Sequence, residues 1–255
     1  MLSVVIPAYN ESKTIAHVLA AVSAALPDVD KEIIVVDDGS TDGTREWLTR
    51  NIPAGEARFT GISLAADGGI QSTGGARDIS VRAILHPRNK GKGGALRTGF
   101  DAVRGSVVVI QDADLEYDPN DWGVMYRLIA ERQVADVVYG TRFSSPPHRA
   151  LYFHHFMANR LISFLFNLFY NQMLSDIEVC YKMMRREVVD SFRLTSNDFG
   201  IEVEISAQIA RARTWRIYET GISYYGRTYA EGKKINWKDG MKALWYLAKF
   251  RLVTI

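Results

Sequence analysis

Several residue types and patterns are scarce in this sequence of 255 residues, and each scarcity excludes a class of protein. Cys180 is the only cysteine, so an intramolecular disulfide is excluded and we expect a reducing, cytoplasmic setting. No run of about 20 apolar residues is present, which argues against a membrane-spanning helix. Met1 leads directly into an apolar run with no basic segment before it, so we expect no signal peptide. The five histidines lie outside the carboxylate-rich turns described below, so no catalytic histidine is evident.

The charge of the chain is nearly balanced overall but uneven along the sequence. The formal net charge is +2. Residues 211–255 contain ten Lys or Arg and three Asp or Glu, a local charge of +7, which leaves −5 for the rest. A basic C-terminal segment of this kind suits an anionic partner such as a phosphate, a nucleic acid or a lipid surface. An ordinary solvated face would have the same composition, so the charge alone does not decide.

Apolar runs alternate with helical patterns along the first half of the chain. We expect buried strands at residues 2–6, 33–36, 81–85, 107–110 and 136–139, and helices at residues 15–26, 92–103 and 121–132. This alternation predicts an α/β fold, in which helices flank a mostly parallel, twisted sheet. The length fits one large domain, and we expect residues 1–255 to form it. Ligands of such sheets bind beyond the carboxyl ends of the strands.

Residues 53–80 interrupt the alternation. They are rich in Gly, Ala and Ser, and their apolar residues show only weak periodicity. We expect a long, mobile surface insertion between two strands. An extra pair of short strands is the alternative.

Polar turns follow the first two expected strands. The first turn reads Pro7-Ala-Tyr9-Asn10-Glu11, and the second places Asp37 and Asp38 before a glycine. Adjacent side chains point to opposite sides of the chain, so one turn cannot use both aspartates. We therefore expect one carboxylate to be available for a ribose hydroxyl or a base N–H. Turn and capping contacts for both aspartates are the alternative.

Three acids follow the fourth expected strand at alternate positions: Asp112, Asp114 and Glu116. We call them the acid motif. Three neighbouring carboxylates repel one another unless a positive charge lies among them, and Mg²⁺ or Mn²⁺ takes oxygen ligands that it shares with phosphates. We therefore expect a metal site here. A helix cap formed by Asp114 or Asp118 is one alternative, and a phosphatase whose nucleophile is Asp112 is another.

A basic, glycine-rich stretch, residues 89–95 (NKGKGGA), opens the expected helix at 92–103. Its backbone N–H groups and Lys92 offer positive charge to an anion. It is not the phosphate-binding loop of nucleotide triphosphatases, because no Gly-Lys-Ser/Thr occurs.

Residues 152–171 have an unusual helical pattern. Polar residues recur at steps of four and form one narrow stripe, while nearly every other residue is apolar. Arg160 and the stripe would be costly at the centre of a bilayer. A buried core helix and an amphipathic helix lying in a membrane interface both remain open.

Together these motifs resemble the family 2 glycosyltransferases, which have the GT-A fold, and especially the polyprenyl- and dolichyl-phosphate sugar synthases. The resemblance spans nearly the whole chain outside residues 53–80. It is carried by residues 5–11, 34–40, 89–93, 112–116, 140–143, 176–181, 199–204 and 225–234. The chain departs from the pattern at Cys180-Tyr181, where the family has Gly-Phe, and at Glu116, where this branch often has Gln.

The resemblance implies an inverting transfer of a sugar from a nucleotide-diphosphate sugar, of the UDP-glucose or GDP-mannose class, to a polyprenyl or dolichyl phosphate. It implies that Asp114, Arg142 and Arg227 are catalytic and that Mg²⁺ or Mn²⁺ binds Asp112, Asp114 and Glu116. The implied donor-binding residues are Pro7, Tyr9, Asn10, Glu11, Asp37, Asp38, Lys92, Asp112, Arg227 and Lys233. The implied acceptor-binding residues are Arg142, Arg149, Asp176 and Lys234.

Other functions remain open beside this one. A phosphate monoester has a second pKa of about 6 and is already ionised at neutral pH, so it needs no general base. A saccharide or another hydroxyl acceptor would need one, for which Asp176, Glu202 or Glu204 is a candidate. A non-catalytic nucleotide-sugar- or membrane-binding protein is a third hypothesis, which the intact acid motif disfavours.

The resemblance also implies where the protein acts. We expect a peripheral protein on the cytoplasmic face of a membrane, held by the helix at 152–171 and by C-terminal amphipathic helices. The expected partners are the nucleotide sugar, the lipid phosphate and the membrane surface, with no nucleic acid. A second copy of the chain or a membrane protein is a further candidate partner.

Overall fold

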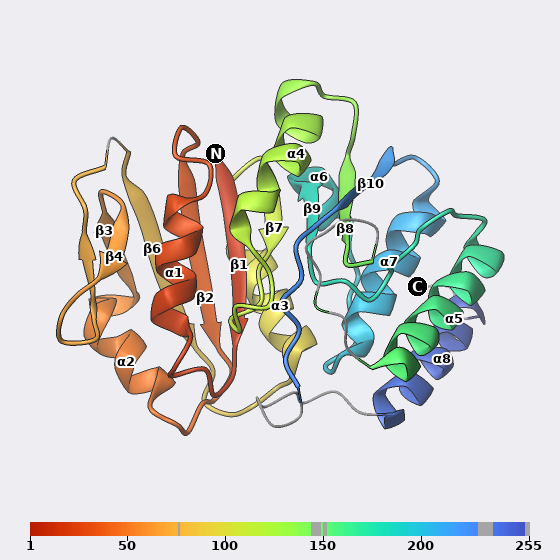
Figure 1. Ribbon diagram of the computed structural model, residues 1–255, viewed down its shortest axis with the longest axis horizontal. Helices are drawn as coiled ribbons and strands as arrows, with labels where there is room; N and C mark the ends of the chain where they lie inside the picture. Colours follow the sequence, from red (N-terminus) through yellow and green to blue (C-terminus); the bar gives the residue numbers. More distant parts are fainter. Residues whose placement is uncertain (76, 144–148, 150–151, 229–236, 253–255) are drawn as a thin grey trace.

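A mixed sheet of eight strands runs through the computed structural model, which describes all residues except 76, 144–148, 150–151, 229–236 and 253–255 (Figure 1). In spatial order the strands are β10 (Ile217–Gly221), β8 (Val137–Thr141), β9 (Lys182–Arg185), β7 (Val107–Ile110), β1 (Leu2–Ala8), β2 (Lys31–Asp37), β6 (Ile79–Leu85) and β3 (Glu56–Phe59). Parallel pairs join β1 to β2 and β7, β2 to β6, and β8 to β10. Among the described strands of this sheet, β3 and β9 run antiparallel to their neighbours. The expected α/β class with a mostly parallel sheet is confirmed.

Helices connect and cover the strands. They are α1 (Ile15–Ala24), α2 (Thr44–Asn51), α3 (Lys92–Ala102), α4 (Trp122–Tyr126), α5 (Phe153–Tyr170), α6 (Arg186–Asp190), α7 (Gly200–Ala212) and α8 (Trp237–Leu252). Short 3₁₀ turns lie at η1 (Pro53–Gly55) and η2 (Pro119–Asp121), and a π-helical turn, η3 (Arg127–Glu131), continues α4. All five strands and all three helices expected from the first half of the sequence are present.

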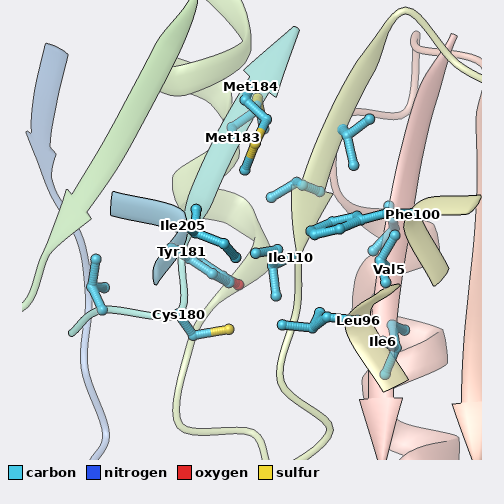
Figure 2. Close-up of a cluster of buried hydrophobic side chains, with 14 of the residues drawn as sticks. Val5, Ile6, Leu96, Phe100, Ile110, Cys180, Tyr181, Met183, Met184 and Ile205 are labelled. Atoms are coloured by element: carbon cyan, nitrogen blue, oxygen red, sulfur yellow. The ribbon is translucent and has the colours of Figure 1, made fainter. Parts of the chain in front are cut away.

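The central strands are buried on both faces, which accounts for their continuous apolar runs. Figure 2 shows Leu96 and Phe100 of α3 beside Val5 of β1 in one buried cluster. Gly99 permits this close packing, because a Cβ atom there would lie 2.3 Å from Cγ1 of Val5. The packing also fixes the first turn of α3 near the carboxyl end of β7, where Lys92 meets the acid motif.

Residues 53–80 are more regular than the expected insertion. They contain β3, which joins the edge of the main sheet antiparallel to β6, and a separate hairpin of β4 (Ile62–Leu64) and β5 (Ile70–Ser72). Ile62 is buried, and its N–H donates to Oγ of Ser23 on α1 at 2.8 Å. The alternative of an extra strand pair is therefore correct. These strands are too short for their alternation to stand out in the sequence.

Candidate active site

A cavity of about 1050 Å³ opens at the carboxyl ends of β1, β2, β7 and β8 and continues between α5 and α8. The sequence-predicted site residues that line it are Pro7, Tyr9, Glu11, Asp38, Lys92, Asp112, Asp114, Glu116, Arg142, Arg149 and Arg227. Asn10, Asp37 and Asp176 are not part of this lining. Lys233 and Lys234 lie outside the described residues. The structure thus brings together side chains that are up to 220 positions apart in the sequence, from Pro7 to Arg227.

Lys92 supplies the positive charge beside the first acid of the motif. Its Nζ lies 2.8 Å from Oδ1 of Asp112 and 3.0 Å from Oε1 of Glu202. Lys182, which is fully buried on β9, contacts the other carboxylate oxygen of Glu202. Burial alone would lower the pKa of Lys92, but the Asp112 carboxylate raises it well above its usual value. Lys92 is therefore a fixed cation at the base of the cavity.

Arg227 supplies the positive charge beside the other two acids. Its Nη2 lies 2.7 Å from Oδ2 of Asp114, and its Nε lies 2.8 Å from Oε1 of Glu116. The segment after β10 delivers it there, because the N–H of Tyr225 donates to the carbonyl of Glu116 at 2.9 Å and the hydroxyl of Tyr224 donates to its carboxylate at 2.9 Å. The acid motif is thus tied to a chain segment more than 100 residues away.

The acid motif keeps an excess of negative charge despite these contacts. Burial, followed by the carboxylates of Asp112 and Glu116, raises the pKa of Asp114 to about 7, although Arg227 opposes the shift. Oxygen ligands in a negative site have the chemistry that Mg²⁺ or Mn²⁺ requires. Within the described part of the chain, however, no three His, Cys, Asp or Glu side chains are grouped so as to hold a metal ion. The carboxylate oxygens of the motif therefore suit a divalent cation. In the structure, however, Arg227 forms ion pairs with two of the three carboxylates.

The two aspartates at the end of β2 both have protein partners, as in the alternative of turn contacts, and Asp38 also lines the cavity. Asp37 is fully buried, and its Oδ2 accepts hydrogen bonds from Nε and Nη2 of Arg45 at 3.0 and 2.8 Å. Asp38 accepts from the backbone N–H groups of Lys90 at 2.9 Å and Gly91 at 2.7 Å. These two amides of the glycine-rich stretch therefore bind the Asp38 carboxylate, because buried polar groups form hydrogen bonds within the protein.

Asn10 has a structural role in the first turn. Its backbone is left-handed, with φ of 57°, which asparagine tolerates better than most residues. Its Oδ1 accepts from the N–H of Thr41 at 2.8 Å, and its own N–H donates to Oγ of Ser40 at 2.9 Å. Asn10 therefore joins the turns after β1 and β2 and lies behind the cavity wall.

At the other end of the cavity Arg142 is held by a buried clamp. Its Nε and Nη2 donate to the two carboxylate oxygens of Asp176 at 2.7 and 2.8 Å. Its guanidinium also lies 5.4 Å from the ring centroids of Phe143 and Tyr224. Burial would raise the pKa of Asp176, but Arg142 holds it below its usual value. Because Asp176 is fully buried, it positions Arg142 from behind and does not reach an acceptor in the cavity.

The three candidate general bases differ in their access to the cavity. Asp176 is enclosed by Arg142, and Glu204 is fully buried, where its carboxylate accepts from Thr195 and Ser196. Of these three, Glu202 lines the cavity, and two lysines contact it there. The structure therefore supplies little support for a base at these positions.

The polar stripe of α5 faces the protein. Nδ2 of Asn159 donates to Asp176 at 3.0 Å, Oγ of Ser163 accepts from the N–H of Ile177 at 3.3 Å, and Asn167 exchanges two hydrogen bonds with Leu174. Several large apolar side chains of the same helix are exposed, namely Phe153, Phe156, Met157, Leu161, Phe164, Leu168 and Phe169. A buried core helix would hide these side chains, so the structure excludes the core-helix alternative over this face.

Several cavity residues were not identified from the sequence. They are Tyr117, Glu178, Cys180 and Tyr224, together with residues 240–244 of α8. Lys182, behind the wall, was missed as well. Residues 176–181 belong to a segment that carries the family resemblance, and this was the available signal for Glu178 and the neighbouring Lys182.

Comparison with known proteins identifies the family. The sequence pattern described as "Glycosyl transferase family 2" matches residues 3–193. The chain is a family 2 glycosyltransferase. Among its family 2 relatives, glycosyltransferase AglJ of Haloferax volcanii is 29% identical over 222 residues, which cover 87% of this chain and 62% of that protein. The low-salt glycan biosynthesis hexosyltransferase Agl6 of the same species is 27% identical, over 99% of this chain and 53% of that protein.

This family 2 chain thus spans less than two thirds of those two relatives. It spans more of the undecaprenyl-phosphate mannosyltransferase of Micrococcus luteus, which is 29% identical over 90% of this chain and 85% of that protein. Among solved structures, glucosyl-3-phosphoglycerate synthase of Mycobacterium tuberculosis aligns with a TM-score of 0.66 at 18% identity, over 100% of this chain and 82% of that chain. The same synthase with Mn²⁺, UDP and phosphoglyceric acid aligns with a TM-score of 0.64 at 20% identity, over 100% and 80%. This likeness confirms the GT-A fold.

Proposed function

We propose that this glycosyltransferase moves a sugar, with inversion, from a nucleotide-diphosphate sugar to a polyprenyl phosphate. One observation carries the proposal: a single cavity joins the acid motif and its cations to an apolar channel between α5 and α8, with Arg142 between them. A charged donor and a phosphate with a long apolar tail would each find matching chemistry along this path. Relatives whose names specify undecaprenyl phosphate as acceptor support the same substrate class.

The donor diphosphate would lie at the acid-motif end of the cavity. Lys92 and Arg227 provide the cationic side chains there, while Pro7, Tyr9 and Asp38 line the same end of the cavity. As the glycosidic bond breaks, negative charge grows on the leaving nucleoside diphosphate. Arg227 would then stabilise that charge once it has left Asp114 and Glu116. UDP-glucose and GDP-mannose are the donor classes that we propose.

A divalent cation would complete the donor site. Asp114 and Glu116, with Asp112 beside them, are the residues that would hold Mg²⁺ or Mn²⁺. A bound cation supplies Lewis-acid help to the leaving diphosphate. Because Arg227 contacts two of these carboxylates, its guanidinium would turn from them toward the diphosphate when the cation and the donor bind. The complexes of the structural relative with Mn²⁺ support this choice of ion.

The acceptor phosphate would lie between the acid motif and α5. Arg142 presents a guanidinium whose orientation is fixed by Asp176, and Arg149 lines the same part of the cavity. A phosphate monoester is ionised at neutral pH, with a second pKa of about 6, so it can attack the sugar without a general base. The apolar side chains of Phe156, Leu161 and Leu244 line the continuation of the cavity and suit a prenyl chain.

A lipid acceptor requires the enzyme to reach a membrane. None of the helices in the described ranges is long and apolar enough to cross a bilayer. The exposed apolar face of α5 and the exposed Met241 and Trp245 of α8 belong to two helices that pack against each other. Lys242 and Lys249 lie on α8 beside them and would add roughly 1 kcal/mol each near anionic headgroups. We therefore propose peripheral attachment through α5 and α8 at a cytoplasmic membrane face.

Nucleotide release tests this function directly. The protein would be incubated with Mg²⁺ or Mn²⁺ and each of several nucleotide sugars, including UDP-glucose and GDP-mannose, with and without a polyprenyl phosphate. We expect one donor to release its nucleoside diphosphate when the lipid phosphate is added. If free sugars or simple alcohols release more nucleotide than polyprenyl phosphate does, the acceptor is a hydroxyl compound and the proposal is wrong.

A further inference from the structure

Residues 176–180, which include a turn at residues 177–178, run along the wall of the cavity. Asp176, Ile177 and Val179 are fully buried, whereas Glu178 and Cys180 line the cavity. Asp176 holds Arg142 at the acceptor end, and Cys180 lines the cavity at the donor end, where burial and then the nearby Asp112 carboxylate raise the pKa of its thiol. Glu178 lies between Asp176 and Cys180 in the sequence and lines the cavity, with Arg142 and Asp176 near its carboxylate.

Glu178 differs from four other carboxylates that line the cavity. Asp112, Asp114, Glu116 and Glu202 each form an ion pair with a lysine or an arginine. Across the ranges that the structure describes, Glu178 forms none, and its single hydrogen bond is to Nδ2 of Asn159, 3.3 Å from Oε2. Its other oxygen, Oε1, has no hydrogen-bond donor there. Burial raises the pKa of Glu178, with Arg142 opposing the shift.

Asn159, beside Glu178, also has a hydrogen-bond acceptor that receives no hydrogen bond. Only 5% of this residue is exposed. Its Nδ2 donates to both Asp176 at 3.0 Å and Glu178 at 3.3 Å, which fixes the orientation of the amide. Its Oδ1 is consequently buried and has no hydrogen-bond partner within the described residues, although Asn159 lines the cavity. A buried acceptor without a donor is unfavourable, so this position favours a ligand that donates hydrogen bonds.

The chemistry of these two acceptors selects among ligands. A phosphate offers oxygen atoms and negative charge, which Glu178 would repel. Neighbouring hydroxyl groups of a sugar offer O–H donors, which a carboxylate oxygen and an amide oxygen both accept. Both residues lie next to Asp176, whose carboxylate holds Arg142. The transferred sugar must lie beside the acceptor phosphate that Arg142 would bind, since the reaction joins the sugar of one substrate to the phosphate of the other.

We propose that Glu178 and Asn159 form the subsite that binds hydroxyl groups of the transferred sugar and so select a neutral hexose. This assignment rests on the proposed function. Glu178 accepts from one hydroxyl through Oε1, and Asn159 accepts from its neighbour through Oδ1. Glu178 then determines which sugar is transferred, while the residues of the acid motif determine that a nucleoside diphosphate is bound.

Binding measurements without acceptor separate the sugar from the nucleotide. The preferred nucleotide sugar and the corresponding nucleoside diphosphate would each be titrated in the presence of Mg²⁺ into the wild type and into Glu178→Ala by calorimetry. We expect the variant to bind the nucleotide sugar about tenfold or more weakly, because a site built to bind a hydroxyl depends on that bond. The affinity for the nucleoside diphosphate, which carries no sugar, should be unchanged. Equal weakening of both ligands, or of neither, would overturn the assignment.

Glu178→Gln is the matched variant, since it keeps the shape and the Oε1 acceptor and removes the charge. It should retain most of the affinity for the nucleotide sugar, and it replaces Glu178→Ala as the test if the alanine variant does not fold. In that case deoxy analogues of the nucleotide sugar are titrated into the wild type and Glu178→Gln. Loss of one particular hydroxyl should weaken binding to the wild type about tenfold and weaken binding to the variant less. If every deoxy analogue binds both proteins as the parent sugar does, only water occupies the subsite and the proposal fails.

The proposed function and the subsite fail in different ways. If the wild type binds no nucleotide sugar at all, the proposed donor is wrong, and the proposed subsite is wrong as well. If the wild type binds nucleotide sugar and transfers it, but Glu178→Ala keeps the same affinity for both titrated ligands, the function stands and the subsite alone is wrong.

Discussion

Arg227 binds Asp114 across 113 positions of sequence, with Nη2 2.7 Å from Oδ2. The arginine thus occupies the side of the acid motif where a diphosphate and its cation would bind. Lys92 contacts Asp112 on the other side of the motif. A lysine and an arginine thus offset part of the repulsion among the three neighbouring carboxylates of the motif.

Arg227 should be needed for catalysis. Arg227→Ala removes the side chain that would stabilise the departing nucleoside diphosphate, so we expect kcat/KM for the donor to fall by about 10²-fold or more, the range seen when a group that stabilises developing charge is lost. Steady-state kinetics would measure this. Arg216→Ala is the matched control, because Arg216 is an exposed arginine of the same region whose partner is Asp136. Equal activity in both variants would show that Arg227 is an ordinary surface charge.

Asp114 should make the folding stability of the metal-free protein depend on pH. Its pKa is raised to about 7 by burial and by Asp112 and Glu116, whereas an unfolded aspartate titrates near 3.9. The folded state therefore binds this proton more tightly. The resulting stability is full below about pH 4 and is lost as the pH rises through about 7.

Asp114→Asn removes that dependence. In EDTA the variant should unfold at a higher temperature than the wild type at pH 8.5, and the difference should shrink toward pH 5. Asp101→Asn, at an exposed position on α3, is the control. A melting-temperature difference for Asp114→Asn that is the same at both pH values would contradict this account of the acid motif.

Asp176 should act on the acceptor through Arg142. Asp176→Ala leaves the guanidinium of Arg142 without its buried partner, which costs about 3–5 kcal/mol of folding free energy when a buried pair is broken. Urea unfolding would measure this loss. Asp176→Asn keeps the shape and an oxygen acceptor, so it should fold, raise the KM for polyprenyl phosphate and leave nucleotide-sugar affinity unchanged. An Asp176→Asn enzyme with wild-type acceptor KM would show that the clamp does not position Arg142 for the acceptor.

The exposed face of α5 should bind membranes. Phe164 and Leu168 are 62% and 66% exposed, so the double variant Phe164→Glu, Leu168→Glu should remain folded, because neither side chain fills the core. It should no longer sediment with anionic liposomes and should use long-chain acceptor poorly. Phe166→Glu is the contrasting variant: Phe166 is fully buried, and its replacement should unfold the protein. A double variant that still sediments with the liposomes would place the membrane contact elsewhere.

The fold could be predicted from the sequence where local patterns determine it. The runs around Val4, Ile34 and Val108 are continuous because both faces of their strands are buried, and this pattern is visible without a structure. The strands within residues 53–80 could not be predicted, since segments of three or four residues show no clear period. Their stability comes from tertiary contacts such as that of Ile62 with Ser23.

The site was predicted in part for a similar reason. The acid motif, Lys92, Arg142 and Arg227 were all found from the sequence, and all line one cavity. The partners of each charge were not found. Asp176 pairs with Arg142 and Asp38 pairs with backbone amides of the glycine-rich stretch, and such pairings depend on how distant segments pack. The sequence identifies charged residues but does not show which of them neutralise one another.

One measurement tests the central claim most directly: mass spectrometry of the lipid product formed from a nucleotide sugar, Mg²⁺ and polyprenyl phosphate. The account predicts a lipid whose mass exceeds that of polyprenyl phosphate by one sugar residue. It also predicts no product from the polyprenol that lacks phosphate at pH 7, and none in EDTA. A glycosylated polyprenol, or turnover of a free saccharide with polyprenyl phosphate left unmodified, would contradict it.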